Sequence, residues 1–169
     1  LNKMKRNLLL SRTVIIGFAV AVRCLTSNSC HAATRNWDGG GANGFWDASA
    51  NWSNNVAPAN GDVLVFPASA NRLNNTNRAS GGLTNFHSLR LLGDEYQIFS
   101  APLNVTNGMT NISGIGTFSA FNTLNAVIQP RASQTWSIGS RKLLTLNSNV
   151  TFPATPPITL TLDVGGSGG

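Results

Sequence analysis

The chain has 169 residues and a formal net charge of +6, from 12 basic and 6 acidic residues. Five of the basic residues lie in the first 23 positions. Beyond residue 32, seven basic and six acidic residues nearly balance. This balance argues against nucleic-acid binding, because such binding needs basic residues clustered in the folded domain. Both cysteines, Cys24 and Cys30, also precede residue 33, so disulfides cannot stabilise the remainder as they do in small secreted scaffolds.

The first element in chain order is a predicted secretory signal peptide over residues 1–32. Four basic residues precede an apolar run at 13–22, and small residues flank the expected cleavage site after Ala32. The apolar run is about half the ~20 residues that a membrane-spanning helix needs, and Arg23 ends it. We therefore expect no stable membrane span and a protein that is secreted, extracellular or displayed on the outer-membrane surface.

Residues 33–62 form the second predicted region, which is rich in tryptophan, glycine and asparagine. Trp37, Trp46 and Trp52 fall within a stretch of sixteen positions, although their neighbours are turn-forming residues. Large aromatic residues normally accompany apolar runs, so this placement calls for an explanation from the fold.

Residues 63–164 contain short apolar runs bounded by Gly, Asn or Pro. Asn, Thr, Ser and Gly make up 60 of the 137 residues from Ala33 onward, and Glu95 is the only glutamate, so an all-β fold is favoured over a helical one. In residues 158–164, apolar side chains alternate with polar ones, which predicts a strand with one buried face. The predicted strands are residues 63–66, 86–92, 95–99, 103–106, 109–113, 124–129, 135–138, 143–146, 149–152 and 158–164.

Two architectures accommodate such strands. An antiparallel β-sandwich would join matched strands by two-residue turns such as Asn-Gly, but most connections here are longer. A right-handed parallel β-helix places Asn, Gly, Thr and Ser at its bends, where stacked side chains satisfy one another. The excess of Asn and Thr favours the β-helix, with about 20–30 residues per coil and about five coils. The β-sandwich remains the alternative.

A β-helix exposes the apolar cross-section of its first coil unless something covers it. We interpret residues 33–62 as an N-terminal cap in which Trp37, Trp46 and Trp52 are buried, since each ring can bury roughly 150–250 Å². The alternative interpretation of the same rings is a sugar-stacking platform. Buried rings favour the cap, whereas solvent-exposed rings favour the platform.

Few residues offer catalytic chemistry. His87 is the only histidine beyond the predicted signal peptide, and no cysteine remains, so a metal site of the usual N/S type is not expected. Five of the six acids stand in turn contexts, and the side chains of Asp38, Asp47 and Asp62 are expected to bond nearby backbone there. We therefore expect no catalytic residue, metal site or cofactor.

A series of turn and core residues lies beyond the predicted signal: Trp37-Asp38-Gly39-Gly40, Gly44-Phe45-Trp46-Asp47, Asn51-Trp52, Pro58, Gly61-Asp62, residues 63–66, Ser88-Leu89, Tyr96, Gln134-Thr135-Trp136 and the final LTLDVGGSGG. In these residues the region resembles the N-terminal part of bacterial proteins that carry autotransporter-associated β-strand repeats. The resemblance implies a parallel β-helix displayed at or released from the cell surface, and it implies no active site. It also implies that the β-helix continues beyond Gly169, the glycine-rich residues 165–169 being an uncapped end.

The predicted function is structural or adhesive: residues 33–62 would cap the β-helix and set the stacking of its coils. An extracellular polysaccharide or a cell-surface ligand is the expected partner. A carbohydrate-binding β-sandwich module is the alternative, and a polysaccharide-degrading β-helix enzyme is a third possibility.

Overall fold

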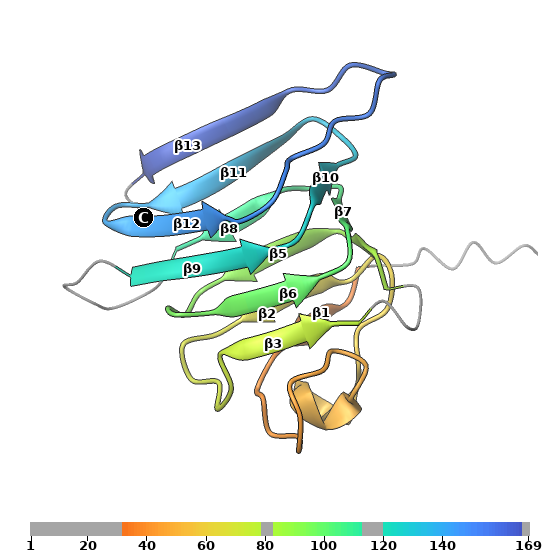
Figure 1. Ribbon diagram of the computed structural model, residues 1–169, viewed down its shortest axis with the longest axis vertical. Helices are drawn as coiled ribbons and strands as arrows, with labels where there is room; N and C mark the ends of the chain where they lie inside the picture. The colour runs from red at the N-terminus through yellow and green to blue at the C-terminus, as the bar shows by residue number, and fades with distance from the viewer. Residues whose placement is uncertain (1–31, 79–82, 113–119, 167–169) are drawn as a thin grey trace, which may run out of the picture.

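The protein is a right-handed parallel β-helix of about five turns (Figure 1). The computed structural model describes residues 32–78, 83–112 and 120–166. Within these residues the only helical elements are two short 3₁₀ turns, η1 (Ser49–Asn51) and η2 (Ser53–Asn55).

Three sheets form the faces of the β-helix. The first contains β1 (Thr34–Asn36), β2 (Val63–Phe66), β5 (Ser88–Leu91), β8 (Met109–Asn111), β11 (Gln134–Gly139) and β13 (Leu160–Gly166), in that order. The second contains β3 (Asn74–Asn77), β6 (Gln97–Ser100), β9 (Ala120–Asn125) and β12 (Lys142–Leu146). The third contains β4 (Asn85–Phe86), β7 (Leu103–Val105) and β10 (Ile128–Pro130).

Every pairing between these strands is parallel, so the antiparallel β-sandwich alternative is wrong. Along the first sheet, successive rungs lie between 20 residues (Leu89 to Met109) and 29 residues (Thr34 to Val63) apart in the sequence. This confirms the expected coil length. Each coil therefore supplies one strand to each face before the chain climbs to the next rung.

Inward-facing residues stack in register along the helix axis. Leu64, Leu89, Met109 and Trp136 occupy one row of the first sheet, and all four are buried. Because neighbouring parallel strands keep the same side-chain direction at paired positions, one apolar residue per coil is enough to continue a core row. The spacing of the apolar runs in the sequence is therefore the spacing of the coils.

The interior also contains a buried asparagine. Asn122 accepts a hydrogen bond from the backbone N–H of Tyr96 and donates to the oxygens of Gly93 and Asn111, at 2.7–2.9 Å. A buried amide is tolerated when its donors and acceptors are all paired. Asn122 thereby links the bends of two successive coils, which explains an interior polar residue in a core row.

Two predicted strands are each divided by a corner. The run at 86–92 breaks at His87, where the third face turns into the first, and the run at 124–129 breaks at Ala126–Val127 between β9 and β10. The apolar pattern continues through each corner because both flanking strands point residues at the same core. Periodicity alone therefore cannot place these corners.

The polar strand β3 was not predicted, because its sequence is NNTN. Its inward-facing residues are Asn75 and Asn77, which are buried and bonded rather than apolar. Conversely, residues 149–152 form no strand and make only an isolated parallel bridge between Val150 and Ile128. The strand expected from residue 95 begins at Gln97, after the turn at Glu95.

The last strand, β13, has the predicted alternation but not the predicted burial. Leu162 pairs with the buried Trp136 in the same core row, yet Leu162 is 59% exposed and Val164 is 69% exposed. In the first sheet β13 has a neighbour on one side only. The apolar face of β13 is therefore open within the described residues, because no further rung covers it.

Candidate functional site

The tryptophan-rich segment folds as an irregular first turn beneath the regular coils. Its strand β1 lies beside β2 in the first sheet, and its Phe45 bridges Thr76 of β3 in the second sheet. The two 3₁₀ turns lie below these contacts, at the N-terminal end of the stack in Figure 1. We refer to residues 33–62 as the tryptophan cap.

All three tryptophans of the tryptophan cap are buried. Trp37 and Trp46 are 0% exposed and Trp52 is 1% exposed. The ring of Trp52 meets those of Trp37 and Trp46 edge to face, at centroid distances of 5.1 and 6.1 Å. These are the favourable geometries for aromatic pairs, so the three rings form one packed unit.

Phe66 of β2 joins this unit to the first regular coil. Its ring lies 6.3 Å from Trp37, 5.6 Å from Trp46 and 6.0 Å from Trp52, measured between centroids. On its other side Phe66 packs against the buried Tyr96 at 5.4 Å. The aromatic cluster therefore runs without interruption from the tryptophan cap into the second coil.

Each buried indole N–H has a hydrogen-bond acceptor. Trp37 donates to the backbone oxygen of Arg72 at 2.7 Å, and Trp52 donates to the backbone oxygen of Trp46 at 2.8 Å. Trp46 donates to Oδ1 of Asn75 at 2.7 Å. Because an unpaired buried N–H is costly, these acceptors determine which way each ring can face. The hydrogen bond from Trp46 thus explains why β3 has an asparagine at position 75, where other strands have an apolar residue.

The backbone of the tryptophan cap passes so close to neighbouring residues at two positions, Gly39 and Gly41, that there is no room for a side chain. Gly39 has φ of +65°, and a Cβ there would lie 2.6 Å from the backbone nitrogen of Arg72. A Cβ on Gly41 would lie 2.7 Å from Oδ1 of the buried Asn51, which accepts the Gly41 N–H at 2.9 Å. Glycine is needed at both positions because only it leaves room for these contacts.

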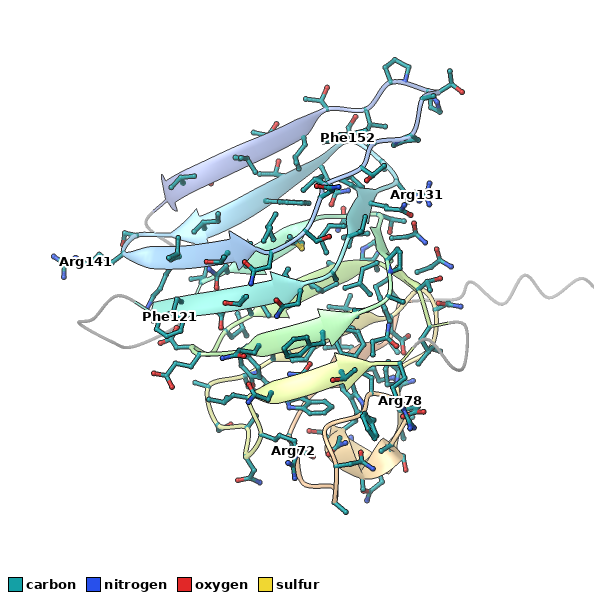
Figure 2. All side chains as sticks on the ribbon, in the orientation of Figure 1. Arg72, Arg78, Phe121, Arg131, Arg141 and Phe152 are labelled. Carbon is teal, nitrogen blue, oxygen red and sulfur yellow. The ribbon has the colours of Figure 1, made fainter. Side chains whose placement is uncertain are left out.

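Charged residues fasten the edges of the tryptophan cap. Asp62 accepts from Nε of Arg35 at 2.9 Å and from the backbone N–H of Ala59 at 2.9 Å. At the other side, Arg78 bonds Asp47 at 2.6 Å and lies 3.9 Å from the centre of the Phe45 ring. Figure 2 shows Arg78 at the level of the tryptophan cap. The Arg78 pair is solvent-exposed, so its contribution to stability is small.

The expected roles of the aspartates can now be compared with their contacts. Asp38 accepts the backbone N–H of Gly40 at 2.9 Å, and Asp62 accepts that of Ala59, so both bond nearby backbone as predicted. Asp47 accepts a hydrogen bond from Arg78, thirty-one residues away in sequence. Long-range pairs of this kind leave no local pattern in the sequence.

His87 and the basic residues Arg131 and Lys142 belong to different parts of the fold. His87 lies at the corner between β4 and β5, where its backbone bonds Asp62 and Asn107. Nζ of Lys142 lies 3.8 Å from Oδ1 of Asp94. The guanidinium of Arg131 donates hydrogen bonds to the side-chain oxygens of Asn104 and Gln129. Within residues 32–78, 83–112 and 120–166, no three His, Cys, Asp or Glu side chains gather as metal ligands would.

The described part of the chain has no helix with the length and apolar character needed to cross a bilayer. The predicted signal peptide, residues 1–32, lies outside the described residues apart from Ala32. Of the glycine-rich residues 165–169, Gly165 and Gly166 belong to β13, and the last three lie outside the described residues.

In comparisons with known proteins, no protein-family model, no curated protein sequence and no solved structure matched this chain.

Proposed function

We propose that this chain forms the capped beginning of a secreted or surface-displayed bacterial β-helix with a structural and adhesive, non-catalytic role. The tryptophan cap covers the first coil, and the opposite edge, at β13, receives further β structure. The observation that carries the proposal is the burial of Trp37, Trp46 and Trp52 against Phe66. Rings that are fully covered present no face to a sugar, so they support the cap rather than the platform.

The need for a cap follows from the parallel stack. Each inner coil is covered above and below by its neighbours, but the first coil has a neighbour on one side only. An exposed apolar cross-section and an unpaired strand edge promote association with other chains. In this protein the cross-section beneath Phe66 is filled by indole rings, and the edge strand β1 is only three residues long and carries Arg35. Both are devices that discourage edge-to-edge pairing.

The two ends of the stack differ in a way that gives the assembly a direction. At β13 the apolar side chains of Leu162 and Val164 are open, and Leu162 is already in register with the buried row that contains Trp136. A further parallel rung laid on β13 would bury them as Leu89 is buried by its neighbours. One covered end and one open end together favour growth from β13 only.

Export and surface display are the second part of the proposal. The charged start, apolar run and small residues of residues 1–32 support export through a cleaved signal. The resemblance to autotransporter-associated β-strand repeat proteins supports display on the cell surface. We expect the exported protein to begin at Ala33, which amino-terminal sequencing of protein recovered from a bacterial periplasm would check; retention of residues 1–32 would contradict it.

The tryptophan cap is tested by comparing Trp52→Ala with Trp136→Ala. Both tryptophans are buried, but Trp136 lies within β11 rather than in the tryptophan cap. Each substitution should lower the free energy of unfolding by ~3–5 kcal/mol. Only Trp52→Ala should also open the first end and produce polymers, because a molecule with two open ends can associate head to tail without closing.

Light scattering coupled to a sizing column measures the polymers, and urea denaturation measures the stability. Polymers in Trp52→Ala but not in Trp136→Ala support the tryptophan cap. Equal behaviour of the two variants, or a Trp52→Ala protein that melts like the wild type and stays the same size, would contradict it.

A further inference from the structure

A shallow open groove lies where the tryptophan cap meets the second sheet. Its volume is about 590 Å³, and none of the three buried tryptophans lines it. Figure 2 shows two of its lining residues, Arg72 beside the tryptophan cap and Phe121 at the start of β9. The groove is lined by Asn71, Arg72, Leu73, Asn74, Glu95, Gln97 and Phe121.

The backbone beneath the groove is held by hydrogen bonds between different coils. The N–H of Asn71 donates to the oxygen of Asp38 at 2.8 Å, and that of Gln97 donates to the oxygen of Leu73 at 3.1 Å. The N–H of Glu95 donates to the oxygen of Phe121 at 2.8 Å. The positions of the lining residues are therefore set by the stack itself, which is the pre-organisation that a binding site requires.

Polar side chains in the groove lack partners that similar side chains have elsewhere. Elsewhere on the stack, asparagines at the surface bond across coils, as Asn104 does to Asn85 at 2.7 Å and Asn147 to Asn125 at 3.0 Å. Within the described part of the chain, no side-chain hydrogen bond is formed by the four polar groove residues other than arginine. These are Asn71, Asn74, Glu95 and Gln97, and all four are exposed.

The same groove has one exposed aromatic wall. Phe121 is 48% exposed, although most aromatic residues in the described part of the chain are buried. An exposed apolar ring among unpaired amide groups suits a ligand that has one apolar face and a periphery of hydroxyls. A pyranose ring has that combination, because its axial C–H groups can cover the phenyl ring while its hydroxyls bond to amide and carboxylate groups.

The charges of the groove favour an uncharged ligand. Arg72 contributes one positive charge and Glu95 one negative charge. Nη2 of Arg72 already donates to the oxygen of Gly41 at 3.2 Å, so part of its donor capacity is used within the protein. A carboxylate on the ligand would meet Glu95 as a like charge, which disfavours acidic sugars.

We propose that this groove binds a neutral hexose or pentose unit of an extracellular polysaccharide, with Phe121 as the stacking surface and Asn74 and Gln97 as hydrogen-bonding groups. The inference rests on the adhesive part of the proposed function and does not depend on what the tryptophan cap does. It moves the sugar-binding surface from the tryptophans to the sheet face beside them.

Native gel electrophoresis tests it, with soluble polysaccharides cast into the gel. Three neutral polymers serve as probes: xyloglucan, galactomannan and mixed-linkage β-glucan. Polygalacturonate serves as the acidic probe. The exported wild-type protein should be retarded, relative to a non-binding reference protein, in at least one neutral gel.

Phe121→Ala is the informative variant, and Phe99→Ala is its matched control. Phe99 is 44% exposed on the same sheet but does not line the groove. Phe121→Ala should weaken binding by roughly tenfold or more, because it removes the main apolar surface that a sugar can cover. Phe99→Ala should bind like the wild type. Gln97→Ala should also weaken binding. Because Gln97 is exposed, this variant still tests the groove if Phe121→Ala does not fold.

Circular dichroism melting of each variant confirms that it is folded. Absence of retardation in all three neutral gels overturns the proposal, as does retardation in polygalacturonate alone or equal loss in Phe121→Ala and Phe99→Ala. None of these outcomes bears on the proposed role of the tryptophan cap, because that role is tested separately by polymer formation in Trp52→Ala.

Discussion

The indole N–H of Trp46 donates a 2.7 Å hydrogen bond to Oδ1 of Asn75, and both side chains are buried. Trp46 belongs to the tryptophan cap and Asn75 to the first strand of the second sheet, twenty-nine residues later. The bond therefore joins the tryptophan cap to the regular β-helix, and it accounts for a polar residue inside an otherwise apolar row.

We predict that this bond makes the two positions energetically coupled. Trp46→Phe leaves Oδ1 of Asn75 buried without its donor and should cost about 1–3 kcal/mol beyond the loss of apolar area. Asn75→Leu alone leaves the indole N–H unpaired. In Trp46→Phe combined with Asn75→Leu, no unpaired group of this bond remains, so the double variant should lose less than the sum of the single losses.

Urea denaturation of the four proteins measures this coupling as a double-mutant cycle. The Asn75 amide also donates to the oxygen of Leu73, but that oxygen keeps a second donor, the N–H of Gln97. Strictly additive losses would show that the hydrogen bond does not determine the position of the ring.

A second prediction concerns the close approach of Gly39 to Arg72. Gly39→Ala places a Cβ 2.6 Å from a backbone nitrogen, whereas Gly61, at φ of +92°, has no atom within 4 Å of its added Cβ. Gly61→Ala should therefore cost only the ~1–2 kcal/mol of a left-handed alanine. Gly39→Ala should cost at least ~1 kcal/mol more, since backbone must move. Equal shifts of the urea midpoint in the two variants would show that the backbone at Arg72 can move away from the added Cβ without a loss of stability.

A third prediction concerns alkaline pH. Burial of Tyr96 raises the pKa of its phenol well above the ordinary tyrosine value of about 10. At pH values above about 10 the unfolded chain releases this proton while the folded protein keeps it, so the stability present at neutral pH is lost as the pH rises. The slope should be about −1.4 kcal/mol per pH unit for this one group.

Tyr96→Phe provides the control, because Tyr96 is the only tyrosine in the chain. The variant loses the hydrogen bond from the phenol to the backbone oxygen of Pro67, at about 1 kcal/mol, but should lack this part of the alkaline dependence. Unfolding free energies measured from pH 8 to 11 would compare the two proteins. Parallel curves would mean that Tyr96 ionises as freely in the folded state as in the unfolded one.

A fourth prediction concerns the open edge at β13. Leu162 is 59% exposed, so Leu162→Lys should change the unfolding free energy by no more than ~0.5 kcal/mol. It should nevertheless reduce association of the exported protein at high concentration, because a lysine on an edge strand opposes pairing. Phe99→Lys adds the same charge within an inner strand, and should leave association unchanged.

Sedimentation equilibrium across a range of protein concentrations measures that association. A protein of residues 33–169 with an intact tryptophan cap should expose one stacking edge, at β13, so it should reach dimers rather than polymers. A monomeric wild type at all concentrations, or equal effects of the two lysine variants, would remove β13 as an assembly edge.

The sequence by itself determined the class of fold and the length of its coils. Apolar positions such as Leu64, Leu89 and Met109 recur once per coil because a parallel stack repeats the same inward position, and that repetition is visible along the chain. The turn-forming neighbours of Trp37 and Trp52 likewise indicated a compact, irregular region before the regular strands.

Only the tertiary structure decided where the corners fall, which polar residues lie inside, and which aromatic residues face solvent. Asn75 forms part of a strand because a tryptophan from a distant segment supplies its donor, and Phe121 is exposed because its strand turns that position outward from the stack. Sequence periodicity records which residues alternate. A polar residue is stable in the core when a residue of another coil supplies its hydrogen-bond partner. An aromatic residue is exposed when its position in the strand faces away from the core. Both depend on how the coils stack.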